Sequence, residues 1–214
     1  DGSSDAVIAR RYDAAGNPLG SEFQVNQYTT RGQFSPAVAA DAAGDFVIAW
    51  ASDGQDGSYA VIARRYDAAG SPRGSEFQVN QYTTGTQFFP GVSADAAGDF
   101  VVAWTSYGQN GTYARRYDAA GNSLGNEFQV NQSSAIGEKY PAVAMDAAGD
   151  FVIVWESQGQ DGSGYGVYAQ QYDAAGKLVG NEFRVNQYTT NDQRYPAGGM
   201  DAAGDIVSSC ASEE

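Results

Sequence analysis

The sequence contains no histidine, a single cysteine and few charged residues, which make up 18% of the chain. Without histidine, neither a histidine-based catalytic triad nor histidine metal ligation is available. Cys210 cannot form an internal disulfide, and no histidine is present to activate it as a nucleophile. No apolar run approaches the roughly 18 residues that a membrane span requires. We therefore expect no histidine- or cysteine-based chemistry and no membrane insertion.

Acidic residues outnumber basic ones by 26 to 12, which gives a net charge of −14 and an isoelectric point near 4.2. Nucleic acids and anionic membrane surfaces are poor partners for such a chain. Aromatic residues are plentiful, with 14 Tyr and 10 Phe among 214 residues. Many aromatics and few charges favour a folded, β-rich protein over a disordered one. Metal ions, cationic ligands and neutral sugars remain as partner classes.

The tetrapeptide DAAG occurs eight times and marks an internal repeat. Four copies follow a tyrosine, and these tyrosines recur every 51 to 55 residues. Each repeat contains four short segments in which large apolar residues alternate with smaller or polar ones, as in residues 46–51. A period of two is typical of β-strands, and four strands in about 50 residues form a propeller blade.

The sequence predicts an all-β, four-bladed propeller of four-stranded antiparallel blades in one domain, 1–214. Three blades cover about 35–82, 89–131 and 140–188, and the fourth combines 195–214 with 1–28. A blade shared between the two ends of the chain would close the ring and remove two free sheet edges. This interpretation favours a monomer. The alternative is a piece of a longer array, in which two chains close a larger ring together.

The DAAG segments lie between strand patterns and are predicted to be hairpin turns. The aspartate side chain can accept backbone N–H bonds two residues on, and glycine adopts positive φ at little cost. The alternative is calcium binding, because DAAGD brings two carboxylates four residues apart. Calcium requires six to eight oxygen ligands, and here alanines stand where further ligands are needed. The turn is the favoured interpretation.

The longer loops at 52–60, 106–114 and 157–166 are rich in amide, hydroxyl and aromatic side chains. Such groups bind sugars, because they combine hydrogen bonding with an apolar face for stacking. The alternative is that these loops are simply polar turns over solvent. The predicted ligand-binding residues are Gln55, Asp56, Tyr59, Gln109, Asn110, Tyr113, Gln160, Asp161 and Tyr165.

A second candidate site follows from the architecture, because the first strand of each propeller blade lines the central channel. Ala39, Ser93, Ala144 and Gly199 occupy equivalent positions in these strands. Their backbone carbonyls are predicted to converge on calcium or another ion. No other cofactor is predicted.

The acidic residues argue against catalysis, because most of them recur blade by blade. Paired carboxylates can hydrolyse glycosides, but an active site needs unlike groups that converge from different blades. Glu138, Lys139 and Glu156 depart from the repeat, and nothing in the sequence links them. The sequence therefore predicts a protein that is not an enzyme.

The segment GQDGSGYGVYAQQYDAAG at 159–176 carries the most specific resemblance. It resembles tandem repeats of very large secreted or surface proteins of bacteria, many of which carry hemolysin-type calcium-binding (RTX) or cadherin-like segments elsewhere. The glycine-rich calcium-binding nonapeptide of RTX proteins is absent, so that role does not transfer. Four-bladed closure is also similar in architecture to hemopexin-type domains.

The resemblance implies a secreted or cell-surface module of bacterial adhesion or ligand binding. We therefore expect a non-enzymatic, lectin-like module for multivalent recognition of carbohydrate or of a surface partner. The alternative is a structural spacer or interaction repeat of a larger surface protein, with no small ligand.

Overall fold

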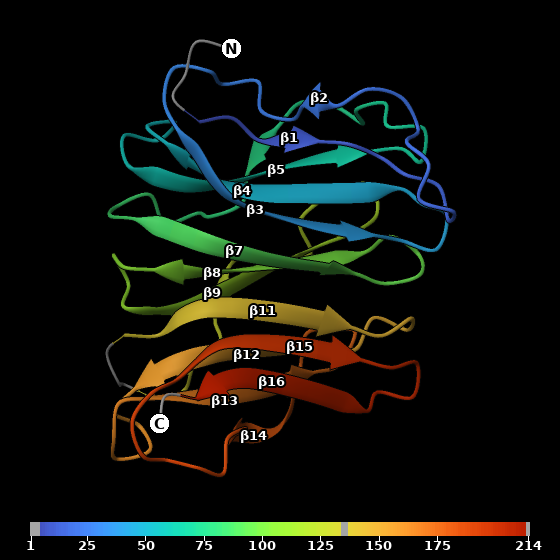
Figure 1. Cartoon of the computed structure of the whole chain (residues 1–214). Helices are drawn as coiled ribbons and strands as arrows, with labels where there is room; N and C mark the ends of the chain where they lie inside the picture. The colour runs from blue at the N-terminus through green and yellow to red at the C-terminus, as the bar shows by residue number, and fades with distance from the viewer. Residues whose placement is uncertain (1–4, 134–136, 213–214) are drawn as a thin grey trace.

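The computed structural model describes residues 5–133 and 137–212. These residues form sixteen β-strands, and none of them belongs to a helix that could span a membrane (Figure 1). The strands form successive sheets that stack along the molecule in the order of the sequence. The predicted all-β architecture is confirmed.

Three sheets are complete four-stranded antiparallel blades in which the strands follow one another in chain order. The alternating apolar and small residues of the repeat place one face of each strand against each neighbouring blade. The first blade contains β3 (Gln33–Ala40), β4 (Phe46–Asp53), β5 (Tyr59–Tyr66) and β6 (Phe77–Gln78). The second contains β7 (Gln87–Ala94), β8 (Phe100–Ser106), β9 (Gly111–Tyr117) and β10 (Phe128–Gln129). The third contains β11 (Lys139–Met145), β12 (Phe151–Gln158), β13 (Tyr165–Tyr172) and β14 (Leu178–Arg184).

The remaining strands form two separate two-stranded sheets, β1 (Ile8–Ala9) with β2 (Phe23–Gln24) and β15 (Gln193–Met200) with β16 (Ile206–Ser212). The shared blade predicted from the sequence is therefore not formed in this structure. The two half-sheets lie at opposite ends of the stack (Figure 1). Each one buries its apolar face on the adjacent blade. Val25, directly after β2, packs with Trp50, and Ile206 on β16 packs with Val152.

The core consists of aromatic and branched side chains between neighbouring sheets. Trp50 and Trp104 are fully buried, and each donates its indole N–H to a glutamine of the first strand, Gln33 or Gln87, over 2.8 and 3.0 Å. A buried indole N–H usually finds an acceptor, because leaving it unpaired costs free energy. Repetition of this bond fixes the first strand of a blade to the second.

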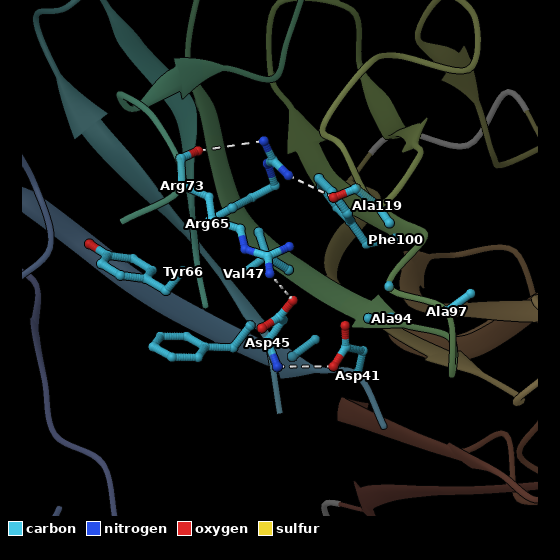
Figure 2. Close-up of a pocket in the computed structure, with 13 residues that line it drawn as sticks. Asp41, Asp45, Val47, Arg65, Tyr66, Arg73, Ala94, Ala97, Phe100 and Ala119 are labelled. Atoms are coloured by element: carbon cyan, nitrogen blue, oxygen red, sulfur yellow. Dashed lines mark hydrogen bonds and ion pairs between the residues drawn. The ribbon is translucent and has the colours of Figure 1, made fainter. Parts of the chain in front are cut away.

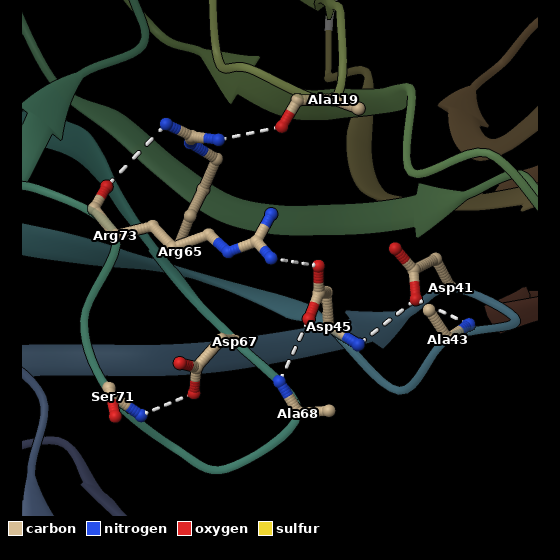
Figure 3. A network of polar contacts seen from close by, with 9 residues as sticks. All are labelled: Asp41, Ala43, Asp45, Arg65, Asp67, Ala68, Ser71, Arg73 and Ala119. Atoms are coloured by element: carbon tan, nitrogen blue, oxygen red, sulfur yellow. Dashed lines mark hydrogen bonds and ion pairs between the residues drawn. The ribbon is translucent and has the colours of Figure 1, made fainter.

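The DAAG segments are hairpin turns, as predicted. Asp41 Oδ1 accepts the backbone N–H groups of Ala43 and Asp45, both over 2.9 Å, and Gly44 has a φ of 86° (Figure 3). Glycine adopts this left-handed conformation without the steric cost that a side chain brings. Within the described residues, no group of three or more acidic or cysteine side chains is placed to hold a metal ion.

Candidate functional site

The three predicted loop glutamines make the same contact in each blade. Each side-chain amide donates to a glutamate carboxylate near the fourth strand of its own blade, and that carboxylate accepts a backbone N–H of the preceding sheet or blade. For example, Gln55 donates to Glu76 over 2.7 Å, and Glu76 accepts the N–H of Gln27 over 2.6 Å. The other two pairs are Gln109 with Glu127 and Gln160 with Glu182. The glutamates link neighbouring sheets, and the glutamines hold them in place.

The other predicted loop residues also lie in separate blades. Two of them cap turns: Asp56 accepts the N–H of Ser58 over 3.1 Å, and Asp161 accepts that of Ser163 over 3.2 Å. Asn110 supplies a turn residue with a φ of 53°. Ligand binding at these positions stays a prediction. The tyrosines Tyr59, Tyr113 and Tyr165 are half-buried or buried.

The predicted channel positions lie on the four first strands, β3, β7, β11 and β15. Ala39, Ser93, Ala144 and Gly199 each sit near the DAAG end of their strand. Because the sheets form an open stack, these strands lie in a row (Figure 1). An ion held by their carbonyls stays a prediction.

An aromatic hollow crosses the same four strands. Its volume is about 310 Å³, and each strand contributes a residue followed by proline. The rings of Phe89 and Tyr140 lie 4.2 Å apart between centroids, and those of Tyr140 and Tyr195 lie 5.6 Å apart. Rings in a row offer an apolar surface on which a sugar can stack. The lining residues are Ser35, Pro36, Phe89, Pro90, Tyr140, Pro141, Tyr195 and Pro196.

An irregularity of the backbone produces this hollow. The residue before proline has a positive φ in all four strands, from 50° at Ser35 to 55° at Tyr195. Strand pairing shifts register at the same place, which is the mark of a β-bulge. Positive φ is costly for a bulky side chain, so such residues persist only where the surrounding structure holds them. Here the bulges lie where the aromatic side chains line the hollow.

A buried carboxyl group lies beside Tyr195. Glu156, on β12, is fully buried, and its Oε1 accepts the backbone N–H of Tyr195 over 2.6 Å. Its Oε2 has no hydrogen-bond partner within residues 5–133 and 137–212. Lys139 on β11 is its direct partner across the strand ladder. Burial raises the pKa of Glu156, although the bond from Tyr195 and the charges of Arg194 and Lys139 lower it.

A second carboxylate, Asp192, lies in the connection before β15. Its Oδ1 accepts the N–H of Tyr165 over 2.9 Å, and its Oδ2 forms an ion pair with Arg194 Nε over 2.9 Å. Besides burial, the negative charge of Asp192 also raises the pKa of Glu156. The two carboxyl groups thus have unlike surroundings. One is buried with a free oxygen, and the other is partly exposed and paired with a cation.

Cationic and aromatic side chains complete the cluster. The guanidinium of Arg194 lies 4.1 Å from the ring centroid of Tyr165, and Lys139 Nζ donates to the Tyr165 hydroxyl over 3.4 Å. The ammonium group also lies 6.0 Å from the ring of Tyr107. Of the loop residues predicted to bind ligand, Tyr165 contributes to this cluster. We call Lys139, Glu156, Tyr165, Asp192 and Arg194 the acidic cluster from here on.

The acidic cluster is unique among the repeats. In the other repeats, alanine or threonine stands at the position of Glu156, and glycine or threonine at that of Asp192. The sequence-based view that nothing links the exceptional residues is wrong for Lys139 and Glu156, because strand register places them opposite each other. Asp192 was missed altogether. Comparison of aligned positions for departures from the repeat could have found it.

A hollow at the DAAG face is a weaker candidate. Figure 2 shows that it lies between the first and second blades, with Asp41, Asp45 and Arg65 among its lining residues. Its charged side chains already have partners within the protein. Arg73 pairs with Asp45 over 2.6 Å, and Arg65 donates to the Ala119 carbonyl over 2.6 Å (Figure 3). At about 60 Å³ it holds only a few water molecules.

No family model and no curated protein matches the sequence. Several solved structures are similar in fold. An α-L-arabinanase of Penicillium chrysogenum, complexed with arabinobiose, superposes with a TM-score of 0.61 at 14% identity over 90% of this chain. An α-L-arabinofuranosidase of Lactobacillus brevis gives 0.54 at 12% identity, over 96% of this chain and 76% of that one. The fold is a β-propeller.

A third neighbour is an endo-1,4-β-xylanase of Bacteroides thetaiotaomicron, with a TM-score of 0.50 at 11% identity over 82% of this chain and 64% of that one. The chain spans 63% of the length of the arabinanase. These neighbours are glycoside hydrolases. This finding overturns the sequence-based expectation of a non-enzymatic binding module. The physical reason for the error is that acids recurring in every blade drew attention away from the acidic cluster, where unlike groups meet.

Proposed function

We propose that the chain is a glycoside hydrolase in which Glu156 is the general acid and Asp192 is the second carboxylate. The observation that carries this proposal is the placement of two carboxyl groups in unlike surroundings beside an aromatic hollow. Glycoside hydrolysis uses such a pair, one carboxyl protonated and the other ionised. The neighbours with this fold support the same reaction class.

The hydrogen bonds define what each carboxyl does. Tyr195 N–H occupies Oε1 of Glu156, so the proton of the neutral acid resides on Oε2. Oε2 donates this proton to the glycosidic oxygen as the bond from that oxygen to the anomeric carbon breaks. Asp192, paired with Arg194, faces the positive charge that develops on the sugar ring. Water then adds to the anomeric carbon and restores the proton to Glu156.

The aromatic hollow supplies the sugar-binding surface. Tyr195 joins the hollow to the acidic cluster, because its ring lines the former and its backbone binds Glu156. Glu156 itself is fully buried, whereas the ring of Tyr195 is 62% exposed. A substrate therefore reaches Oε2 only when the side chains that bury Glu156 move aside.

The names of the neighbours suggest the substrate class. They are an arabinanase, an arabinofuranosidase and a xylanase, so we propose a pentose-containing polysaccharide. Such polymers lie outside cells, which agrees with the secreted or cell-surface location that the sequence resemblance implies. That location, its bacterial origin and the link to RTX- or cadherin-associated proteins rest on the resemblance alone.

The test compares initial rates on aryl α-L-arabinofuranosides and β-D-xylosides for the full chain and three variants. Glu156→Gln and Asp192→Asn each remove one carboxylate and keep its shape. Asp205→Asn is the matched control, since Asp205 is an exposed carboxylate in a DAAG turn, at the opposite end of the strands. We expect a loss of about 100-fold or more in kcat/KM for the first two variants. An unchanged rate in either of them, with Asp205→Asn also unchanged, would overturn the assignment.

A further inference from the structure

Two strands of this chain have a free edge. In each complete blade the second strand pairs with the third, as β4 does with β5. β16 pairs with β15 in the register of a second strand, and β1 pairs with β2 in the register of a third. Among the strands that the structure describes, neither β16 nor β1 has a partner on its other edge. The half-sheet β15–β16 therefore lacks a third and fourth strand, and the half-sheet β1–β2 lacks a first and second strand.

An open apolar groove lies beside β1, where the first and second strands of its blade would pack. It has a volume of about 370 Å³ and runs between β1 and β3, with Val7, Ile8 and Val38 among its lining residues. Ile8 is 52% exposed and Val38 is 65% exposed. Exposed apolar surface of this kind marks an interaction site when it is contiguous.

The opposite end of the stack carries the matching surface. Val207 on β16 is 75% exposed. Its equivalent in the first blade is Val47, and the equivalent of Val38 in the second blade is Val92. Val47 and Val92 belong to one buried cluster between those blades. The residues that the chain buries at its internal junctions are thus exposed at its two ends.

We propose that the half-sheet β15–β16 of a second copy of this chain fills the groove, so that its β16 pairs with β1 and completes a four-stranded blade. The two half-sheets of one chain lie at opposite ends of the stack, and each is already packed on its neighbouring blade (Figure 1). In the first blade, Trp50 on β4 pairs with Ile62 on β5. Cys210 is the equivalent of Trp50 and Ile8 is the equivalent of Ile62. The same register therefore places Cys210 of the second copy opposite Ile8. In the same way, Val207 of the second copy packs against Val38. The junction gives the larger ring of two chains instead of the closed monomer.

Disulfide formation tests this register, because Cys210 is the sole cysteine of the chain. Directly opposite residues of antiparallel strands have Cα atoms about 4.5–5.5 Å apart, which is within the range for a disulfide. We expect Ile8→Cys to give reducible dimers and head-to-tail multimers of the 22.5 kDa chain on mild oxidation. The matched control is Ala9→Cys, whose side chain points to the other face of the strand and which should not cross-link.

Two results would overturn the proposal. A reducible bond within one Ile8→Cys chain would show closure by its own half-sheet, and no bond at all would exclude the register.

Light scattering of the unmodified chain gives a second measurement. We expect a mass of at least twice 22.5 kDa, reduced to that of one chain by Val207→Asp and unchanged by Val179→Asp on β14. A monomeric mass for the unmodified chain at tens of micromolar would contradict the proposal. Neither measurement depends on hydrolysis.

Discussion

The backbone N–H of Tyr195 donates a hydrogen bond to Glu156 Oε1 over 2.6 Å, and this bond joins the first strand of one sheet to the second strand of the blade before it. The side chain of the same tyrosine lines the aromatic hollow. A single residue therefore fixes the orientation of the buried acid relative to the proposed sugar-binding surface. The geometry of the acidic cluster depends on how β15 packs on the third blade.

If Glu156 is the general acid, its loss should matter most for substrates with poor leaving groups. A leaving group that departs without protonation needs no proton donor. We expect Glu156→Gln to lose about 100-fold in kcat on an arabino-oligosaccharide and less than about tenfold on a 2,4-dinitrophenyl pentoside. Equal losses on both substrates would mean that Glu156 acts only as a structural group.

The pH profile should report the charges around Glu156. Burial first, and then the charge of Asp192, raises the pKa of this acid, while Arg194 and Lys139 lower it. Activity requires the protonated form, so it should fall as pH rises through this pKa. Lys139→Gln removes a positive charge that lowers the pKa of Glu156, so it should move the alkaline limb of kcat/KM to higher pH. A limb that stays in place or moves to lower pH would contradict the assignment.

The aromatic hollow should contribute to substrate binding rather than to the chemical step. We expect Tyr140→Ala to raise KM about tenfold with little change in kcat, since an aromatic contact contributes about 0.5–1.5 kcal/mol. Tyr12→Ala removes a tyrosine that is 56% exposed in the segment between β1 and β2 and serves as control. The hollow would not be the sugar-binding surface if both variants kept the KM of the unmodified chain.

Glu138 should make stability depend on pH. It takes the place of Gln33 and Gln87 beside the third tryptophan, and its Oε1 accepts the Ser157 hydroxyl over 2.8 Å. Burial raises its pKa from 4.5 to about 7, although the Ser157 bond lowers it. Between these values the folded chain keeps a proton that the unfolded chain has lost. Stability therefore falls as pH rises through this window, by at most about 3 kcal/mol, and stays low above it.

Thermal unfolding at pH 5 and pH 8 measures this effect. Glu138→Gln carries no charge to desolvate, so we expect a smaller loss between the two pH values and a higher melting temperature at pH 8. Glu22→Gln, an exposed glutamate, is the control for the removal of a negative charge. An unchanged pH dependence in Glu138→Gln would show that other groups cause it.

The sequence predicted the parts of the fold that depend on local patterns. The turn at Asp41 and Gly44 and the alternation that buries Trp50 involve residues close together in the chain, so their spacing identifies them. Ring closure is different, because it depends on the angle between successive sheets. That angle arises from the packing of many side chains, and no single pair, such as Val47 with Val92, encodes it.

The acidic cluster was beyond local reasoning for a similar reason. Glu156 and Asp192 are far apart in the sequence and come together through the packing of β15 on the third blade. The loop residues around Gln55 drew attention because they recur, and recurrence here reflects contacts between sheets. Departure from the repeat is the better signal of function in a chain of this kind.

Hydrolysis of arabino- and xylo-oligosaccharides by the full chain, followed by proton NMR of the anomeric signals, tests the proposed glycoside hydrolase activity most directly. We expect cleavage, with a new reducing-end signal that is lost in Glu156→Gln and kept in Asp205→Asn. Intact oligosaccharides of both classes after prolonged incubation with the folded, unmodified chain would contradict it.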